Sequence, residues 1–240
     1  MKTSKMIYLL NIGQYAPEVT RITYPYINLY AKRIGAEIHT ITERKFPDWP
    51  VTYEKLQIYD LAREHKADWS IYVDSDALIH PECPDFTIYL PMGTVAFHSS
   101  DVSHIRFRPD EYNLRDGRYI APGNWFMVAS KLCLDLWRPL ETTPAQAIAR
   151  ITPTPAEKSF GMTAEHLVDD FALTQNIARF GLAFKSFEDI FKERGFRKSL
   201  YHEYTLTIEQ KAKAMSRLIR GLNPNDEKDE REDPYWKIVL

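Results

Sequence analysis

The sequence predicts an α/β fold: a Rossmann-like, mostly parallel central sheet flanked by helices. Three short runs of apolar and β-branched residues, Met6–Asn11, Glu37–Thr42 and Trp69–Val73, have the composition of strands. Segments with helical character lie between them, and this β-α-β-α-β order is typical of a parallel sheet covered by helices. A chain of 240 residues is also long enough to bury one large core.

The two helices between these strands have recognisable ends. The first is predicted over Tyr24–Arg33, because Gly35 stands where helices commonly end in a left-handed residue. The second is predicted over Thr52–His65, because the Thr52 hydroxyl can cap a first turn. Each helix is followed directly by one of the predicted strands, as a parallel sheet requires.

The second half of the chain predicts two more strands, over Thr94–His98 and Asn124–Ala129. The polar segment between them, Ser99–Gly123, is longer than most connections in a compact domain, so we expect it to be functional or mobile. A helix is predicted over Thr163–Phe180, and a further strand over Leu182–Phe187.

The C-terminal part contains one more helix and a charged end. Thr207 and Gln210 have the form of a capping box, and Gly221 is expected to stop the helix. Apolar residues recur at helical spacing along it: Ile208, Ala212, Met215, Ile219 and Leu222. We expect residues 1–222 to form a single domain and residues 223–240 to form a charged, flexible tail.

Composition argues against several classes of function. The formal net charge of −2 gives no broad basic face, so we expect no nucleic-acid partner. No segment approaches the roughly 20 apolar residues of a membrane span. Asn11 interrupts the N-terminal apolar run, which fits a strand better than a signal peptide. Cys83 and Cys133 are too few for a disulfide framework, so we expect free thiols and a reducing, cytoplasmic location.

Two carboxylates stand directly after the third predicted strand. Asp74 and Asp76 flank Ser75, and side chains two residues apart in an extended segment project the same way, so both can reach one cation. Oxygen ligands suit Mg²⁺ or Mn²⁺, which in turn bridge phosphates. Two surface aspartates in a turn would give the same pattern. The position after two β-α units, at the carboxyl end of a parallel strand, favours a ligand site.

The stretch Tyr53–Pro81 resembles the donor-binding half of GT-A glycosyltransferases, in particular the α-galactosyl, mannosyl and xylosyl transferase families and the glycogenin-like family. In those families a helix with a lysine precedes an apolar strand and then Asp-x-Asp. The resemblance implies a GT-A fold with a nucleotide-binding half, residues 1–90, and an acceptor half, residues 91–222. It also implies Mn²⁺ (or Mg²⁺) and transfer of a sugar from a nucleotide-diphosphate sugar, a UDP-sugar favoured, to a hydroxyl of a glycan, glycoprotein or small molecule.

The same resemblance suggests which residues hold the donor. Lys55 is expected near the nucleotide, and Ser75 is grouped with the two aspartates that flank it. Asn11 and Gly13 follow the first strand, where such enzymes hold the base and ribose, and a glycine lets backbone approach a ligand closely. A simple strand-to-loop turn would also account for these last two residues.

Residues on the acceptor side are expected to line the sugar pocket. Gly123 and Asn124 precede an apolar strand, as in the family segment beside the acceptor. Trp125 has two interpretations: its ring can stack on a sugar, or it belongs to the core.

Acidic residues on the helix predicted over Thr163–Phe180 are candidates for catalysis. Glu165 and Asp169 are expected to share one face, with Asp170 beside them. GT-A enzymes often place a carboxylate here. In an inverting enzyme Asp170 or Asp169 would deprotonate the acceptor hydroxyl, and in a retaining enzyme it would hold donor hydroxyls. An exposed acidic helix face is the alternative.

A late histidine completes the expected metal site. His202 follows the last predicted strand, where the glycogenin-like family has a His-x-x-Gly-x-x-Lys pattern with a metal-binding His. Thr205 and Ile208 stand in place of its Gly and Lys. Arg197 and Lys198 are candidates for the missing positive charge, and an exposed His202 without a metal role is the alternative.

Two other classes of protein remain as alternatives. Haloacid-dehalogenase-like phosphatases also have Asp-x-Asp after a strand, but there the first Asp is a nucleophile near the start of the fold, whereas two β-α units precede Asp74. The second alternative is a transferase fold that binds a sugar or a partner protein without catalysis.

Overall fold

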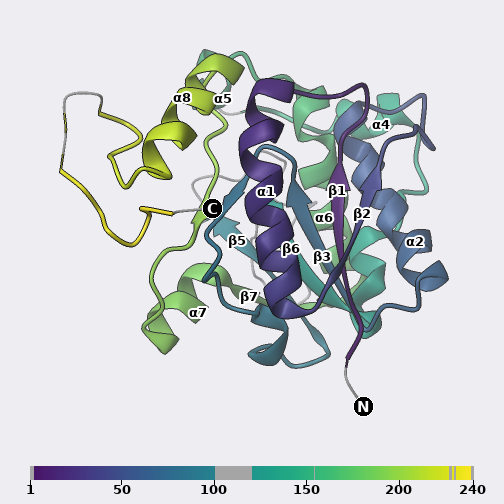
Figure 1. Ribbon diagram of the computed structural model, residues 1–240. Helices are drawn as coiled ribbons and strands as arrows, with labels where there is room; N and C mark the ends of the chain where they lie inside the picture. The colour runs from purple at the N-terminus through teal and green to yellow at the C-terminus, as the bar shows by residue number, and fades with distance from the viewer. Residues whose placement is uncertain (1–2, 101–120, 154, 227–228, 230, 239–240) are drawn as a thin grey trace.

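The computed structural model describes the chain except residues 1–2, 101–120, 154, 227–228, 230 and 239–240. Its centre is a six-stranded sheet in the order β2-β1-β3-β6-β5-β7 (Figure 1). The strands are β1 (Lys5–Leu10), β2 (Glu37–Ile41), β3 (Trp69–Asp74), β5 (Thr94–Ser100), β6 (Ala121–Ser130) and β7 (Ala183–Ser186). Only β6 of these runs against its neighbours. The predicted α/β fold with a mostly parallel sheet is confirmed.

Helices cover both faces of this sheet, and short strands and 3-10 turns join them (Figure 1). The helices are α1 (Pro17–Ile34), α2 (Ile58–Glu64), α4 (Pro144–Ile148), α5 (Pro155–Ser159), α6 (Val168–Phe180), α7 (Phe187–Arg194) and α8 (Ile208–Leu218). The 3-10 segments are η1 (Val51–Gln57), η2 (Phe86–Ile88), η4 (Lys131–Trp137) and η5 (Ala164–Leu167). A separate two-stranded sheet pairs β4 (Leu78–Ile79) with β8 (Leu200–Tyr201).

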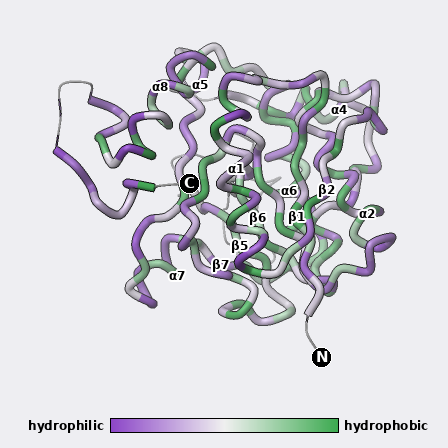
Figure 2. The backbone as a smooth tube through the Cα atoms, viewed as in Figure 1, coloured by the Kyte–Doolittle hydropathy of each residue, from purple (hydrophilic) through white to green (hydrophobic). Residues whose placement is uncertain are grey.

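The hydrophobic core lies between the sheet and these helices. Figure 2 shows hydrophobic residues concentrated around the sheet, while the outer loops are largely hydrophilic. On one face Tyr30 of α1 packs against Phe126 of β6, with ring centroids 6.4 Å apart. On the other, Tyr72 of β3 packs against Trp137 of η4, at 6.1 Å. Burial of both faces explains why the central strands are apolar almost throughout.

The helix α1 is longer than predicted. It begins at Pro17, seven residues before the predicted start, and proline is favourable in a first helical turn. It continues through Pro25, because side chains such as Val19 and Ile27 on both sides of that proline are fully buried and hold the helix in place. Gly35 ends it with φ 68°, as expected.

Thr52 does not cap a helix, and this part of the prediction is wrong. It lies inside the 3-10 segment η1, and its hydroxyl has no hydrogen-bond partner among the described residues. The cause is the buried carboxylate of Glu54, which accepts hydrogen bonds from the Lys45 and Phe46 amides at 2.9 and 3.0 Å and pairs with Arg44 at 2.7 Å. This tertiary network outweighs the local helix signal, and it also fixes the position of Lys55.

The predicted helix over Thr163–Phe180 is likewise divided, into η5 and α6. A 3-10 turn has a different angular step from an α-helix, so Glu165 and Asp169 do not share a face. Glu165 is exposed, whereas Asp169 and Asp170 are buried, at 1% and 6% exposure. The expectation that Glu165 joins the other two acidic residues is therefore wrong.

The C-terminal region packs on the domain. The capping box of Thr207 and Gln210 is present, and α8 ends at Leu218. Beyond it, Trp236 is buried in the same apolar cluster as Met215 and Leu218. The Tyr235 carbonyl accepts a hydrogen bond from His80 at 2.6 Å. The end of the charged segment is therefore docked rather than projecting from the domain.

Most of the long polar segment Ser99–Gly123 lies outside the described residues. Cys83 and Cys133 are free thiols, as expected, and both are buried. Within the part of the chain that the structure describes, no helix combines the length and the apolarity that crossing a membrane requires.

Candidate metal centre

Asp74 and Asp76 lie at the carboxyl end of β3, and Ser75 fixes the turn between them. The Ser75 hydroxyl donates to the Leu10 carbonyl at 2.6 Å, and the Ser75 carbonyl accepts from the Thr23 hydroxyl at 2.5 Å. Ser75 thus ties β3 to the end of β1 and to α1. A serine held in this way sets the direction of both neighbouring carboxylates.

A short strand pair brings His202 to the same place. Because Leu78 pairs with Tyr201 in the β4–β8 ladder, the residue after β8 lies close to the residues before β4. His202 Nε2 is 3.4 Å from Asp76 Oδ1 and 3.9 Å from Asp74 Oδ2. Ligand atoms of the three residues all lie within 4.8 Å of one another. The structure therefore gathers the three predicted metal ligands into one cluster.

Trp125 supports His202 from the side. Its ring stacks on His202 at 5.2 Å with an interplanar angle of 17°, and on His98 at 4.5 Å with an angle of 19°. A register shift between β5 and β6, at Phe97 and His98, leaves Asn124 and Trp125 out of the ladder, and such bulges re-aim side chains. The indole thus contacts two imidazoles and is placed to orient His202.

Lys211 is a member of the cluster that the sequence analysis did not identify. It lies on α8, is only 7% exposed, and its Nζ is 2.5 Å from Asp76 Oδ2. The signal in the sequence was a lysine on the inward face of an amphipathic helix. The candidates named instead lie elsewhere: Arg197 is above the Tyr235 ring, and Lys198 lines a separate cavity beside His98.

These charges determine the ionisation of Asp76. Burial raises the pKa of its carboxyl, but the hydrogen bond and charge of His202 and the ammonium of Lys211 lower it more, so that the pKa is well below its usual range. Burial and the two aspartates raise the pKa of Tyr15, whose hydroxyl is 3.4 Å from Asp76 Oδ2. Asp76 is thus an anion with a neutral phenol beside it.

Lys55 lies next to the cluster of Asp74, Asp76 and His202, in a buried network of polar side chains. Its Nζ is 2.5 Å from Asp169 Oδ2, 3.9 Å from Asp74 Oδ1 and 4.6 Å from the centre of the Tyr72 ring. Burial by itself lowers the pKa of Lys55, but the charges of Asp169 and Asp74 overcome this and raise it. The Asn124 side-chain amide also donates to Asp169 Oδ2. Lys55, Asn124 and Asp169 therefore form one unit that connects α6 to the cluster of Asp74, Asp76 and His202 through Asp74.

The remaining predicted site residues lie near the same edge of the sheet. Asn11 follows β1 directly, and its backbone N–H donates to the Ile41 carbonyl at 2.9 Å. Gly13 has φ 67°, which a glycine adopts without strain, and the space on its Cβ side is open. Gly123 lies in β6 and pairs with His98. Asp170 is adjacent to Asp169 in the first turn of α6.

A cavity of about 500 Å³ opens at the carboxyl ends of β1 and β3, the edge where parallel sheets bind ligands. Its lining combines the cluster with residues from β1 and the loop after it, β3, η1 and η5: Leu10, Ile12, Tyr15, Val51, Thr52, Tyr72, Asp74, Ser75, Asp76, His166, His202 and Lys211. His166 was not predicted. Its Nδ1 accepts from the Thr163 amide at 3.1 Å, so in the neutral ring the proton is on Nε2 and can be donated. The cavity thus contains anionic, cationic and neutral hydrogen-bonding groups.

Neither a family model nor a curated protein sequence matches the chain. The fold does match a solved structure, described as a glycosyltransferase involved in the glycosylation of the major capsid of PBCV-1. The TM-score is 0.52 with 11% sequence identity, and the match covers 89% of this chain and 98% of that chain. At this identity the similarity shows a common fold. The chain therefore has a glycosyltransferase fold of the GT-A kind that the resemblance implied.

Proposed function

We propose that the protein is a metal-dependent glycosyltransferase that takes its sugar from a nucleotide-diphosphate sugar, with a UDP-sugar as the favoured donor. The observation that carries this proposal is the cluster of Asp74, Asp76 and His202 in the wall of a cavity at the carboxyl edge of the sheet. The similarity of fold to a glycosyltransferase supports it. The acceptor would be a hydroxyl of a glycan, a glycoprotein or a small molecule.

The residues of the cluster fit a divalent ion. Separations of 3.4 and 3.9 Å between the imidazole nitrogen and the carboxylate oxygens suit neighbouring ligands that lie about 2.2 Å from one ion. Two carboxylates and one imidazole favour Mn²⁺ over Mg²⁺, because Mg²⁺ prefers oxygen ligands. A bound ion would offset the charge of the leaving diphosphate. Asp74, Asp76 and His202 would hold it, and His166 would donate a hydrogen bond to the donor from another wall of the cavity.

The buried network would align the donor sugar. Lys55 and Asn124 hold Asp169, and Asp74 is both a proposed metal ligand and a neighbour of Lys55. Metal and sugar subsites would therefore share one rigid wall. Asp170 would act as the general base in an inverting reaction or hold a donor hydroxyl in a retaining one.

A thermal-shift screen tests the proposal. We expect UDP-sugars with Mn²⁺ to raise the melting temperature, and the same ligands in EDTA to have a much smaller effect. A ligand at 100 times its Kd adds about 2.7 kcal/mol to the free energy of unfolding. GDP-sugars are the comparison for base preference. If no nucleotide sugar stabilises the protein in Mn²⁺, the proposal is wrong.

Two further readouts separate this proposal from its alternatives. Metal-dependent hydrolysis of a nucleotide sugar to the free sugar would be retained by a transferase without its acceptor, and a pure binding protein would lack it. Release of inorganic phosphate from a simple phosphate ester, with a phosphorylated Asp74, would instead indicate a haloacid-dehalogenase-like phosphatase.

The stacking of Trp125 on His202 gives a separate prediction. Trp125→Ala is expected to weaken Mn²⁺ binding about tenfold, because residues that orient a metal ligand typically contribute tenfold to hundredfold in affinity. Trp125→Phe keeps an aromatic ring, so its Mn²⁺ affinity should stay close to that of wild type. His202→Ala removes a proposed ligand, so it should lose more Mn²⁺ affinity than either Trp125 variant and have a smaller preference for Mn²⁺ over Mg²⁺. Calorimetric Mn²⁺ titrations measure all three. Unchanged Mn²⁺ affinity in Trp125→Ala, together with a raised KM for the acceptor, would assign the indole to the acceptor instead.

A further inference from the structure

We infer that Lys211 is a resident counterion of Asp76 that competes with the divalent ion, so that ion and donor diphosphate bind together rather than independently. This inference rests on the proposed function and concerns how the same site is regulated. The observation behind it is the contact of 2.5 Å between Lys211 Nζ and Asp76 Oδ2, between two side chains that are only 8% and 7% exposed.

The position of Lys211 on α8 is one that an apolar residue would normally occupy. Lys211, Met215 and Leu218 have the spacing of one helix face, and all three are buried. A buried ammonium needs a partner of opposite charge. Among the described residues, Asp76 is the acidic group with which Lys211 forms an ion pair. The lysine is therefore placed for this carboxylate.

The helix cannot easily withdraw the lysine, because Met215 and Leu218 of α8 are buried in the same apolar cluster as residues of α1. The capping box of Thr207 and Gln210 fixes its start. Near its end the Arg217 guanidinium donates to the carbonyls of Asn223, Asp226 and Asp229 at 2.9, 3.0 and 3.0 Å. We therefore expect the Lys211 side chain, rather than the whole helix, to move when Asp76 binds an ion.

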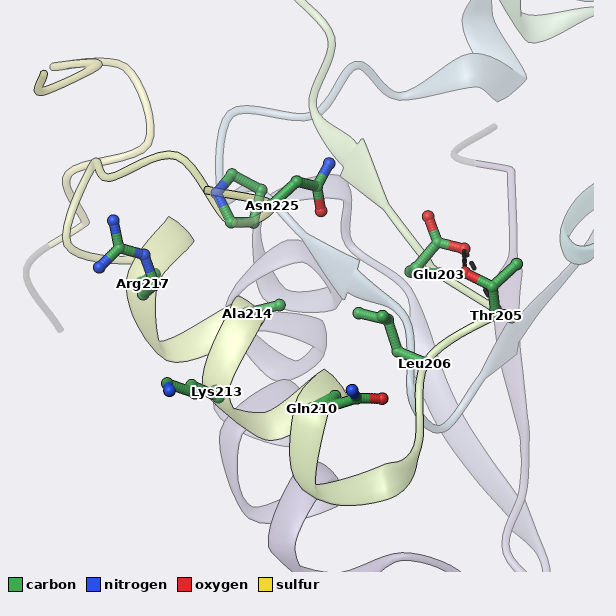
Figure 3. Close-up of a pocket in the computed structure, with 9 residues that line it drawn as sticks. Glu203, Thr205, Leu206, Gln210, Lys213, Ala214, Arg217 and Asn225 are labelled. Carbon is green, nitrogen blue, oxygen red and sulfur yellow. Dashed lines mark hydrogen bonds between the residues drawn. The ribbon is translucent and has the colours of Figure 1, made fainter. Parts of the chain in front are cut away.

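A second side of α8 faces a different space. Gln210, Lys213, Ala214 and Arg217 line a cavity of about 410 Å³, closed on the other side by Glu203, Thr205, Leu206 and the chain near Asn225 (Figure 3). Lys213 is therefore two residues from Lys211 but does not line the cavity that contains Asp76. It provides a matched control within the same helix.

The two oxygens of Asp76 have different partners. Oδ1 is directed to His202, at 3.4 Å, and Oδ2 to Lys211. An ion held by Asp74, Asp76 and His202 would lie within a few ångströms of the ammonium, and like charges repel strongly at low dielectric. The diphosphate of a donor removes this conflict, because it can neutralise the ion and the lysine at once. Each therefore makes the binding of the other more favourable, which is a reciprocal coupling.

Mn²⁺ titrations of Lys211→Met test this inference. Without nucleotide, Lys211→Met is expected to bind Mn²⁺ about tenfold more tightly than wild type, because the competing charge is gone. At saturating Mn²⁺ it should bind UDP about tenfold more weakly, since one phosphate partner is lost, and each tenfold corresponds to about 1.4 kcal/mol. Lys211→Arg keeps the charge and Lys213→Met leaves the site untouched, so both should resemble wild type in the Mn²⁺ titration.

Melting temperatures in EDTA and in Mn²⁺ provide a second readout that does not require the variant to be fully stable. Removal of the lysine leaves Asp76 with less compensation, so Mn²⁺ should stabilise Lys211→Met more than it stabilises wild type. An unchanged or weaker Mn²⁺ affinity in Lys211→Met, while wild type binds Mn²⁺ and UDP together, would overturn this inference and leave the proposed function standing. Absence of Mn²⁺ binding in every variant, Lys211→Met included, would overturn both.

Discussion

Asp76→Asn is expected to weaken Mn²⁺-dependent binding of UDP at least about 100-fold. The substitution removes a direct ligand and its charge, and this should exceed the tenfold to hundredfold loss that is typical when a supporting residue is removed. A hundredfold loss corresponds to about 2.7 kcal/mol of binding free energy. The carboxylate is ionised in the folded protein, since His202 and Lys211 hold its pKa well below the usual range despite burial. Asparagine keeps the shape of the side chain but removes this charge.

Calorimetry of UDP binding in Mn²⁺ and in EDTA measures the effect. Asp68→Asn is a matched control, because Asp68 also pairs with a lysine, Lys131 at 2.8 Å, but precedes β3 at the opposite end of the strand. It should bind UDP as wild type does. Circular dichroism of Asp76→Asn should show a native spectrum, with a lowered melting temperature because the buried Lys211 loses its partner. Full UDP affinity in this variant, or in wild type with EDTA, would contradict a metal-dependent donor site.

The parts of the fold that the sequence predicts well are those with local causes. The capping box at Thr207, the helix end at Gly35 and the end of the predicted helix at Phe180 depend on residues within one turn, and the structure contains each of them. The same holds for Asp74 and Asp76, because a strand that is buried on both faces has a clear signature and its end fixes where they lie.

The features that the sequence did not predict depend on contacts between residues that are far apart in the chain. The 3-10 form of η1 depends on the buried carboxylate of Glu54 and its partners in the preceding loop. Lys211 meets Asp76 across 135 residues, and the amphipathic pattern that places Lys211 on the inward face of α8 does not indicate which carboxylate it meets. The stacking of Trp125 depends on a register shift between β5 and β6. Periodicity and composition do not encode such contacts between distant segments.

Asp169→Asn is expected to be the second large effect, through stability as well as activity. Lys55 is 3% exposed in its side chain, and Asp169 is its nearest carboxylate, at 2.5 Å. Removing one partner of a buried ion pair typically costs about 3–5 kcal/mol, because the other charge is left uncompensated. Asp74 at 3.9 Å and the Tyr72 ring offset part of this, so we expect a loss of about 3 kcal/mol in the free energy of unfolding.

A double-mutant cycle isolates the pair. Lys55→Met should also destabilise the protein, since it leaves Asp169 buried without its cation. The double variant Lys55→Met with Asp169→Asn should lose clearly less free energy of unfolding than the two single variants lose together, because neither buried charge then remains. Denaturant unfolding of the four proteins measures this. Additive losses would show that Lys55 and Asp169 contribute separately.

Asp170→Asn should affect the reaction instead. The carboxylate of Asp169 already accepts from Lys55 and Asn124, which suits a positioning group better than a base. We prefer Asp170, the next residue in the first turn of α6, as the proposed catalytic carboxylate. Its replacement should lower kcat about 100-fold or more, as general bases typically contribute at least that much. Binding of UDP in Mn²⁺ should stay near wild type. If Asp170→Asn transfers normally while a folded Asp169→Asn does not, the two roles are exchanged. Full activity in both variants would remove α6 from the catalytic site.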